Sequence, residues 1–212
     1  MIDDLDLLTD SYDFLLPENL IAQRPIDAVS RDRSKLLVYK KSTNEIIHTE
    51  FSHLGEFLAE NTLLVLNQSK VFPSRLIGNK LSGGKAEVFL LNPEQDADGE
   101  FEALIKTRSK KSIGDVFVFP ENTEAKITKI LDNGTFKVQF NLEIDANYLD
   151  KYAKIPIPPY IRKGESDEED KKNYQTIFAG STGSVAAPTA GLHFTEALFD
   201  KLSAKKINRA YV

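Results

Sequence analysis

The sequence predicts a mixed α/β protein whose central part folds as a small antiparallel β-barrel. Short β-type runs separated by turn residues fill residues 73–150, and strand and helix patterns occur together on both sides of that stretch. The composition, with 41% hydrophobic and 28% charged residues, is that of an ordinary globular protein. The 212 residues are enough for one large domain or two small ones.

The segment before the barrel opens with prolines and the polar stretch 27–33, which predict an irregular start. The run SKLLVYK (34–40) predicts a strand, and NEIIH (44–48) predicts its partner in a hairpin. Apolar residues recur at helical spacing in residues 51–60, which predicts a short amphipathic helix. The continuous apolar run 62–67 is typical of a strand covered on both faces.

Six short runs within residues 73–150 predict strands. The turn before the last of them contains Asn133 and Gly134, which tolerate a positive φ. Six short strands with tight turns favour a closed antiparallel barrel over an open sheet, because closure removes the sheet edges. The expected strands are residues 75–80, 85–92, 101–107, 115–119, 124–131 and 135–140.

After the barrel the chain becomes rich in proline and charge. IPIPPYI (155–161) has too many prolines for a helix or a central strand and predicts a stiff, extended connector. ESDEEDKK (165–172) predicts a solvated charged segment. Thr195 is the expected N-cap of a helix that ends near residue 205, and residues 208–212 predict a further strand.

Several classes of site and location are excluded or disfavoured by what the sequence lacks. Without cysteine, a disulfide framework, a cysteine zinc site, an iron–sulfur cluster and a thiol nucleophile are excluded. No apolar run approaches the ~18 residues of a membrane span, and the acidic start is unlike a signal peptide. We therefore expect a cytoplasmic protein with no membrane partner and no metal.

The net charge of −5 at first disfavours a nucleic-acid partner. However, ten of the 32 acidic residues lie in two clusters, within residues 3–13 and 165–170, and basic residues are in excess elsewhere. The cluster KTRSKK (106–111) lies between two predicted barrel strands. RNA phosphates would be its counterion, and the alternative is an ordinary solvated loop.

The segment GSVAAPTAGLHFT (183–195) is the most informative motif. It combines glycines, other small residues, hydroxyls and His193 directly before a helix. Small residues let a ligand approach the backbone, N–H groups at a turn and helix start favour an anion, and His193 titrates near neutral pH. The pattern predicts a small-molecule site with an acid–base group, and the alternative is a tight loop with a packing histidine.

A second polar segment, residues 67–80, directly follows the predicted buried strand. In α/β proteins the loops at the carboxyl ends of strands form the usual ligand crevice. Lys70 and Arg75 could there bind phosphate or carboxylate, and the alternative is a linker with exposed cations. No glycine-rich dinucleotide loop, Walker A loop or nucleophile elbow occurs in the sequence.

Through these motifs the chain resembles the S-adenosylmethionine:tRNA ribosyltransferase-isomerases of queuosine biosynthesis, the QueA family. The 183–194 segment resembles the family's most specific motif. The resemblance extends over essentially the whole chain and in the family's order, through YDFLLPENLIAQRP, SKLLVY, HTEFSHL, LLVLN, VFPSRLIGNK, IPIPPYI and YQTIFA. The family's Thr-Arg after LLVLN is replaced by Ser69 and Lys70, which keeps the hydroxyl and the positive charge but loses the planar guanidinium fork.

The resemblance implies an α/β domain, residues 1–72 and 151–212, with a six-stranded antiparallel β-barrel inserted at residues 73–150. Because family members continue well past Val212, it also implies that their C-terminal part is missing. The implied reaction moves the ribosyl group of S-adenosylmethionine, a co-substrate, to 7-aminomethyl-7-deazaguanine at the tRNA wobble position. The ribosyl group is rearranged to give epoxyqueuosine, with release of adenine and methionine.

The implied partners are S-adenosylmethionine and a tRNA with a GUN-type anticodon that carries the deazaguanine precursor, and we expect a monomer. We expect His193 to be the catalytic acid–base group, on the wall of an adenosyl pocket that opens toward the barrel. The expected substrate-binding residues are Asn67, Lys70, Arg75, Ser184, Pro188, Thr189, Ala190, Gly191 and Phe194. Two rival functions remain open, a non-catalytic tRNA-binding fragment and an S-adenosylmethionine-dependent methyltransferase, although the missing glycine-rich loop disfavours the second.

Overall fold

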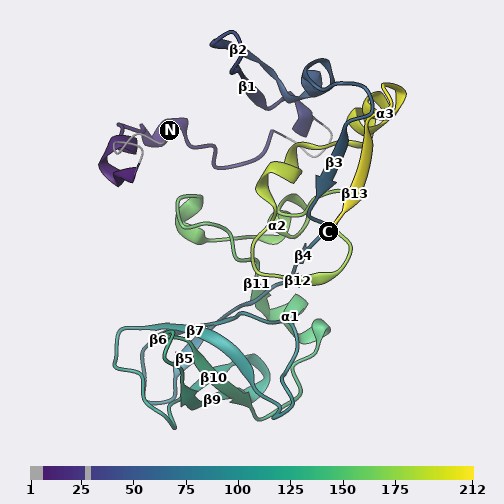
Figure 1. Cartoon of the computed structure of the whole chain (residues 1–212). Coiled ribbons are helices and arrows are strands. Elements are labelled where there is room, and N and C mark those ends of the chain that lie inside the picture. Colours follow the sequence, from purple (N-terminus) through teal and green to yellow (C-terminus); the bar gives the residue numbers. More distant parts are fainter. Residues whose placement is uncertain (1–6, 27–29) are drawn as a thin grey trace.

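The computed structural model describes residues 7–26 and 30–212. The chain forms two lobes: a β-barrel and a mixed lobe of short helices and strands that combines the N-terminal and C-terminal segments (Figure 1). Part of the acidic N-terminal cluster and part of the polar stretch 27–33 lie outside the described residues.

The barrel contains the six predicted strands. Its hydrogen-bonded order is β5-β6-β7-β10-β9-β8, and pairing of β5 with β8 closes the ring, with Asn79 opposite Val118. All of these pairs are antiparallel, so the predicted closed six-stranded barrel within a mixed α/β fold is confirmed. The strands are β5 Arg75–Lys80, β6 Lys85–Leu90, β7 Phe101–Thr107, β8 Val116–Phe119, β9 Thr123–Ile130 and β10 Phe136–Phe140.

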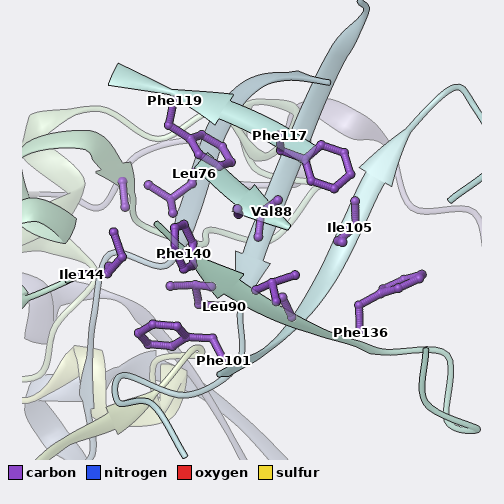
Figure 2. Packing of buried hydrophobic residues seen from close by; sticks show 14 of the residues in the cluster. Leu76, Val88, Leu90, Phe101, Ile105, Phe117, Phe119, Phe136, Phe140 and Ile144 are labelled. Atoms are coloured by element: carbon purple, nitrogen blue, oxygen red, sulfur yellow. The ribbon is translucent and has the colours of Figure 1, made fainter. Parts of the chain in front are cut away.

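Apolar side chains from every barrel strand fill the interior (Figure 2). Leu76, Val88 and Phe117 are completely buried. The Phe101 and Phe140 rings meet edge to face with centroids 5.6 Å apart, a favourable arrangement for aromatic pairs. On β10 the buried residues Phe136, Val138 and Phe140 alternate with more exposed ones, as the period-two pattern predicted.

Helix α1 (Ala146–Tyr152) and strand β11 (Ala153–Lys154) connect the barrel to the mixed lobe, and β11 adds to β5. The next residues, 155–158, form neither helix nor strand, as their prolines predicted. Asp145 caps α1 by accepting a hydrogen bond from the Tyr148 N–H. The division of the chain at residues 73 and 150 stays a prediction.

The mixed lobe contains three two-stranded sheets. Strands β1 (Lys35–Lys40) and β2 (Glu45–Glu50) form the predicted antiparallel hairpin. The other two sheets are parallel and join segments that are distant in sequence. They pair β4 (Lys70–Val71) with β12 (Thr182–Ser184) and β3 (Leu63–Leu66) with β13 (Asn208–Tyr211).

Helix α3 (Glu196–Ala204) begins at the predicted cap, where the Thr195 hydroxyl accepts a hydrogen bond from the Leu198 N–H. Its buried residues include Leu198 and Leu202, which pack with Leu66 of β3 in a second apolar core. Within residues 7–26 and 30–212, the 3₁₀ helices include Thr9–Tyr12, Glu18–Leu20, Arg31–Arg33, Phe51–Phe57, Pro120–Asn122, Arg162–Gly164 and Thr189–His193.

Three sequence predictions require correction. The 62–67 strand is not covered on both faces: Leu63 and Val65 are 57% and 61% exposed, because β3 pairs with β13 alone and one face of this sheet is open within the described residues. The helix predicted at 51–60 is a 3₁₀ helix that ends at Phe57, although Phe51 and Leu54 still pack on the second core. Residues 165–172 are not simply solvated, since they contain all but the last residue of helix α2 (Glu168–Asn173), with Asp170 buried.

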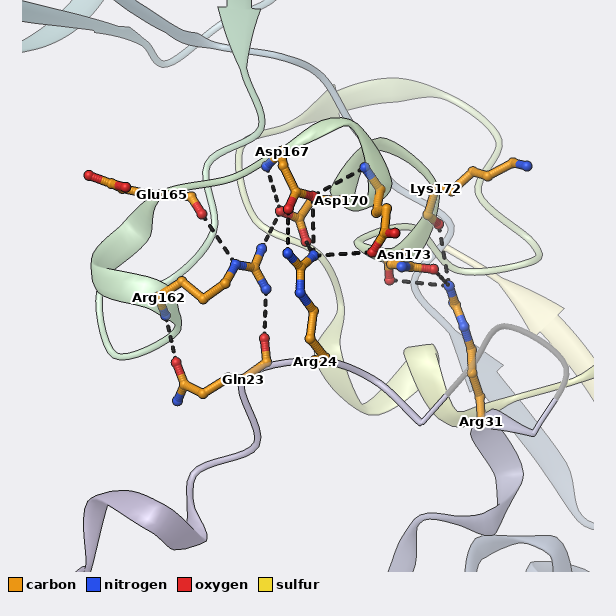
Figure 3. A network of polar contacts seen from close by, with 10 residues as sticks. Gln23, Arg24, Arg31, Arg162, Glu165, Asp167, Asp170, Lys172 and Asn173 are labelled. Atoms are coloured by element: carbon orange, nitrogen blue, oxygen red, sulfur yellow. Dashed lines mark hydrogen bonds and ion pairs between the residues drawn. The ribbon is translucent and has the colours of Figure 1, made fainter.

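Asp170 is buried because it closes a polar network between the N-terminal segment and α2 (Figure 3). It forms an ion pair with Arg162 and accepts the Asp167 N–H in a capping box. Arg162 also donates to the Gln23 carbonyl over 2.6 Å, and Arg24 forms an ion pair with Asp167. This network holds residues 23–24 against α2.

The Arg24 guanidinium lowers the pKa of Asp167 from 3.8 to about 2. A carboxyl group whose pKa is lower in the folded state stabilises the fold above its unfolded pKa, and that contribution is lost as the pH falls through its folded pKa. The Asp167→Asn variant keeps a capping side chain but loses the charge. We expect its melting temperature to lie about 1–3 °C below that of the unchanged chain above pH 4, with the gap closing between pH 4 and pH 2.

Thermal melts of both proteins from pH 7 downward measure this effect. Glu168→Gln is the matched control, because it removes the same charge from an exposed position on the same helix. A gap between Asp167→Asn and the unchanged chain that stays constant down to the lowest pH at which both fold would show that the Arg24 pair contributes nothing.

Candidate active site

The glycine- and hydroxyl-rich bend, residues 183–195, links the two parallel sheets of the mixed lobe through α3. It starts on β12, where the Ser184 Oγ donates to the Ala186 carbonyl over 2.7 Å and accepts the Ala186 N–H. The 3₁₀ helix Thr189–His193 follows, and Thr195 then caps α3. The bend is thus fixed at both ends by hydrogen bonds.

The outer side of the bend faces solvent and its inner side is packed. Thr189 and Ala190 are exposed and Pro188 is half-buried. Gly191 is buried, and a Cβ at this position would lie 3.0 Å from side-chain atoms of both Thr176 and Phe178. A larger residue would therefore push the bend outward, which explains the glycine.

Phe194 lies in the second apolar core. Its ring stacks on Phe199 at a centroid distance of 5.0 Å and meets Phe51 edge to face at 5.0 Å. Because the Phe194 side chain is buried, it anchors the bend to α3. Its predicted contact with a substrate stays a prediction.

His193 is half-buried between the bend and the N-terminal segment. Its Nδ1 lies 2.9 Å from the Ser34 Oγ, and its ring packs against Phe51 with centroids 5.4 Å apart. Burial lowers the pKa of His193, a hydrogen bond to the Arg31 backbone raises it, and the Arg31 charge lowers it further, with a net lowering. The imidazole is therefore neutral at pH 7 and can accept a proton.

The three predicted residues of the 67–75 region lie in different surroundings. The exposed Asn67 accepts the Ser69 N–H at its side-chain oxygen, which shapes the loop after β3. Lys70 is exposed on β4. Arg75 forms a two-point ion pair with Glu87 of β6, with nitrogen–oxygen distances of 3.0 and 2.7 Å, and also donates to the Gly164 carbonyl. The Arg75 guanidinium is thus already bound to Glu87 and to the Gly164 carbonyl.

A cavity of about 670 Å³ lies between the mixed lobe and the barrel. Apolar side chains that include Phe72, Ile144 and Leu149 line it together with the acidic residues Glu94, Glu143, Asp145 and Asp150. Lys70 of β4 and Thr182 of β12 also line this cavity, whereas His193 does not. The structure therefore separates the predicted acid–base group from the cavity that faces the barrel.

Residues 7–26 and 30–212 contain neither a metal-binding cluster nor a membrane-spanning helix. No group of three or more histidine, aspartate or glutamate side chains in this part of the chain is placed to bind a metal. No helix in the same residues is long and apolar enough to cross a membrane.

Comparison with known proteins decides the family. Residues 9–212 match the model of a family described as queuosine biosynthesis protein. The chain belongs to the queuosine biosynthesis protein family. It is 42% identical over 208 residues to the S-adenosylmethionine:tRNA ribosyltransferase-isomerase of Campylobacter jejuni (strain 81-176), and 42% identical over 204 residues to the enzyme of that name from Desulfotalea psychrophila.

These alignments cover most of this chain but only part of the relatives. They include 94% and 93% of the chain, and 59% and 56% of the two relatives. A crystal structure of S-adenosylmethionine tRNA ribosyltransferase from Thermotoga maritima is 29% identical, with 95% of this chain and 56% of that one covered and a TM-score of 0.37. The chain thus spans less than two thirds of the length of the relatives it matches.

In this member of the family, sequence reasoning missed the N-terminal residues that hold the bend. The Arg31 guanidinium, on a residue only 6% exposed, donates to the Gln175 carbonyl over 2.8 Å. Asp32 accepts the Thr195 hydroxyl at 3.1 Å. The polar run before β1 was visible in the sequence, but nothing in its spacing pointed to partners 144 and 163 positions away.

Proposed function

We propose that this chain is part of an S-adenosylmethionine:tRNA ribosyltransferase-isomerase that acts on 7-aminomethyl-7-deazaguanine in a GUN-type anticodon. The observation that carries the proposal is the family membership over residues 9–212, together with the names of the relatives. The exposed side of the bend, from Pro188 to Ala190, supports it by offering small residues that a ligand can approach closely. The protein would work as a monomer without a metal.

In the proposed reaction the positively charged sulfur acidifies the hydrogens on the adjacent ribose carbon. His193, neutral at pH 7, would take one of these protons and leave the electron pair on that carbon. Adenine leaves with the electron pair of its bond to the ribose. Overall, the ribosyl bonds to adenine and to the methionine sulfur break, and each electron pair leaves with its group. A bond to the aminomethyl nitrogen of the base and the internal bonds of the rearranged epoxide form. Of the two protons lost, one from the ribosyl carbon and one from the amine, one goes to adenine and the other to solvent.

The adenosyl group would bind against Pro188–Ala190, with Ser184 and Gly191 shaping the backbone behind it. Lys70 would bind an anionic group of a substrate, because its ammonium forms no ion pair within the described residues and lies at the edge of the cavity between the lobes. Asn67 would contribute through the loop after β3. Arg75 would act through Glu87, by fixing the start of the barrel.

Product analysis with two labelled forms of S-adenosylmethionine tests the proposed function. The protein from the complete reading frame is incubated with precursor-bearing tRNA and co-substrate labelled either in the ribose or in the methyl group. We expect ribose label in the tRNA and free adenine in solution. Methyl label in the tRNA with S-adenosylhomocysteine would indicate a methyltransferase, and tRNA binding without either label would indicate a non-catalytic binding protein.

The basic loop after β7 is the proposed contact with tRNA phosphates. Lys106 near the end of β7 and Arg108 and Lys110 in the loop are exposed, and their side chains form no ion pair with any other described residue. Replacing Lys106 and Arg108 by glutamine should weaken tRNA binding about tenfold and reduce the slope of log affinity against log salt by about 2. Binding isotherms at several salt concentrations measure both quantities.

The matched control replaces the exposed Lys41 and Lys201 by glutamine, which removes the same charge from the mixed lobe. If both double variants change the slope equally, binding depends on net charge alone and the basic loop is not a specific contact.

A further inference from the structure

Ser34, the residue just before β1, lies between His193 and the backbone of the preceding 3₁₀ turn. Its hydroxyl oxygen is 2.7 Å from the Arg31 carbonyl oxygen and 2.9 Å from the His193 Nδ1. A carbonyl oxygen has no hydrogen, so the single hydroxyl hydrogen of Ser34 must point to Arg31. The lone pairs of Ser34 then face the imidazole, and the hydrogen of that contact must come from Nδ1.

From this hydrogen count we propose that Ser34 is a positioning residue that holds His193 in the Nδ1–H tautomer and so leaves the Nε2 lone pair as the proton acceptor. The tautomer of a neutral histidine is set by the partner of one ring nitrogen, and the other nitrogen is then free for chemistry. Besides the Ser34 contact, the imidazole has a hydrogen bond to the Arg31 backbone beside Ser34, and no side chain of the described residues bonds to Nε2. The use of that lone pair as a base rests on the proposed function, whereas the tautomer itself does not.

The turn that carries Ser34 is held from three sides. The Ser34 carbonyl accepts the Phe51 N–H at 2.8 Å, and the Phe51 ring packs on the imidazole. Arg31 is anchored to the segment after α2, and Asp32 to the cap of α3. These contacts fix the backbone at Ser34, and the hydrogen bonds of its hydroxyl group to the Arg31 carbonyl and the His193 Nδ1 then hold the side chain toward the imidazole.

The charges near the ring favour the neutral imidazole. The buried Arg31 guanidinium lies on the same turn and disfavours a second positive charge, while the nearby Asp32 carboxylate is occupied by the Thr195 hydroxyl. A neutral ring with one fixed N–H is the form that can remove a proton through Nε2.

Nitrogen NMR of the imidazole rings tests the tautomer without any substrate. The chain has three histidines, so His193 is identified by the signals lost in His193→Gln, with His48 and His53 as internal references. We expect the long-range ¹⁵N–¹H pattern of an Nδ1–H tautomer for His193 at pH 7.5. Ser34→Ala should convert it to a mixture with Nε2–H, and Ser34→Thr, which keeps the hydroxyl, should restore it.

Two outcomes would overturn the assignment: an Nε2–H pattern for His193 in the unchanged chain, or a Ser34→Ala spectrum identical to it. In the protein from the complete reading frame, Ser34→Ala should also lower kcat for adenine release about tenfold with little change in KM, and Ser34→Thr should recover it. If the tautomer is as assigned but adenine is never released, the proposed function fails and the role of Ser34 stands.

Discussion

His193→Ala in the protein from the complete reading frame is expected to slow adenine release at least about 100-fold, because a positioned acid–base group contributes about 10²–10⁴ to a rate. The neutral imidazole next to the exposed side of the bend is the proposed proton acceptor. Adenine is measured by chromatography under single-turnover conditions, so that slow product release does not hide the effect. Binding of tRNA should remain unchanged.

The other two histidines provide matched controls for this loss. His53 contacts Thr49 and His48 lies on β2, and neither lies on the bend. His48→Ala and His53→Ala should keep the rate within about twofold. Since the His193 ring also packs on Phe51, His193→Gln and a thermal melt check that the fold survives. A rate within threefold of the unchanged protein for a folded His193 variant would remove His193 from the chemistry.

Gly78→Ala should destabilise the barrel by about 3 kcal/mol or more, because the strand pairing that closes it has no room for a methyl group. A Cβ on Gly78 would lie 2.2 Å from the Val118 carbonyl oxygen and 2.7 Å from the Phe119 ring. Both contacts belong to β8, the strand that closes the ring against β5. To relieve the clash, the β5–β8 pairing must open.

Urea unfolding followed by circular dichroism measures this effect, and Asn79→Ala is the matched control on the same strand. Because Asn79 is exposed, Asn79→Ala should lower the free energy of unfolding by about 0.5 kcal/mol or less. If Gly78→Ala were as stable as Asn79→Ala, the paired strands β5 and β8 would have room for a methyl group at residue 78, and the predicted clash would be wrong.

The barrel was predictable because its signals are local. The alternation on residues 136–140 and the turn at Asn133 and Gly134 each depend on neighbours in sequence. The same holds for the β1–β2 hairpin and for the Thr195 cap. The open face of β3 was not predictable, because an apolar run such as 62–67 predicts a strand without saying which elements cover it.

The candidate site was only half predictable for a related reason. The bend is recognisable in the sequence because thirteen consecutive residues combine glycines and hydroxyl groups. Its contact partners, however, come from residues 31–34, and the Ser34–His193 contact spans 159 positions. The capping box at Asp167 was missed because the charges of 165–172 concealed a short helix with one buried carboxylate. Long-range polar contacts of this kind leave no periodic trace in a sequence.

The most direct test of the account is whether S-adenosylmethionine binds beside His193. The protein from the complete reading frame is titrated with the co-substrate in the presence of tRNA, and the His193 imidazole signals are followed, assigned by comparison with His193→Gln. We expect them to shift in proportion to bound co-substrate while those of His48 and His53 stay in place. Saturated binding that leaves the His193 signals unmoved would contradict the proposed active site.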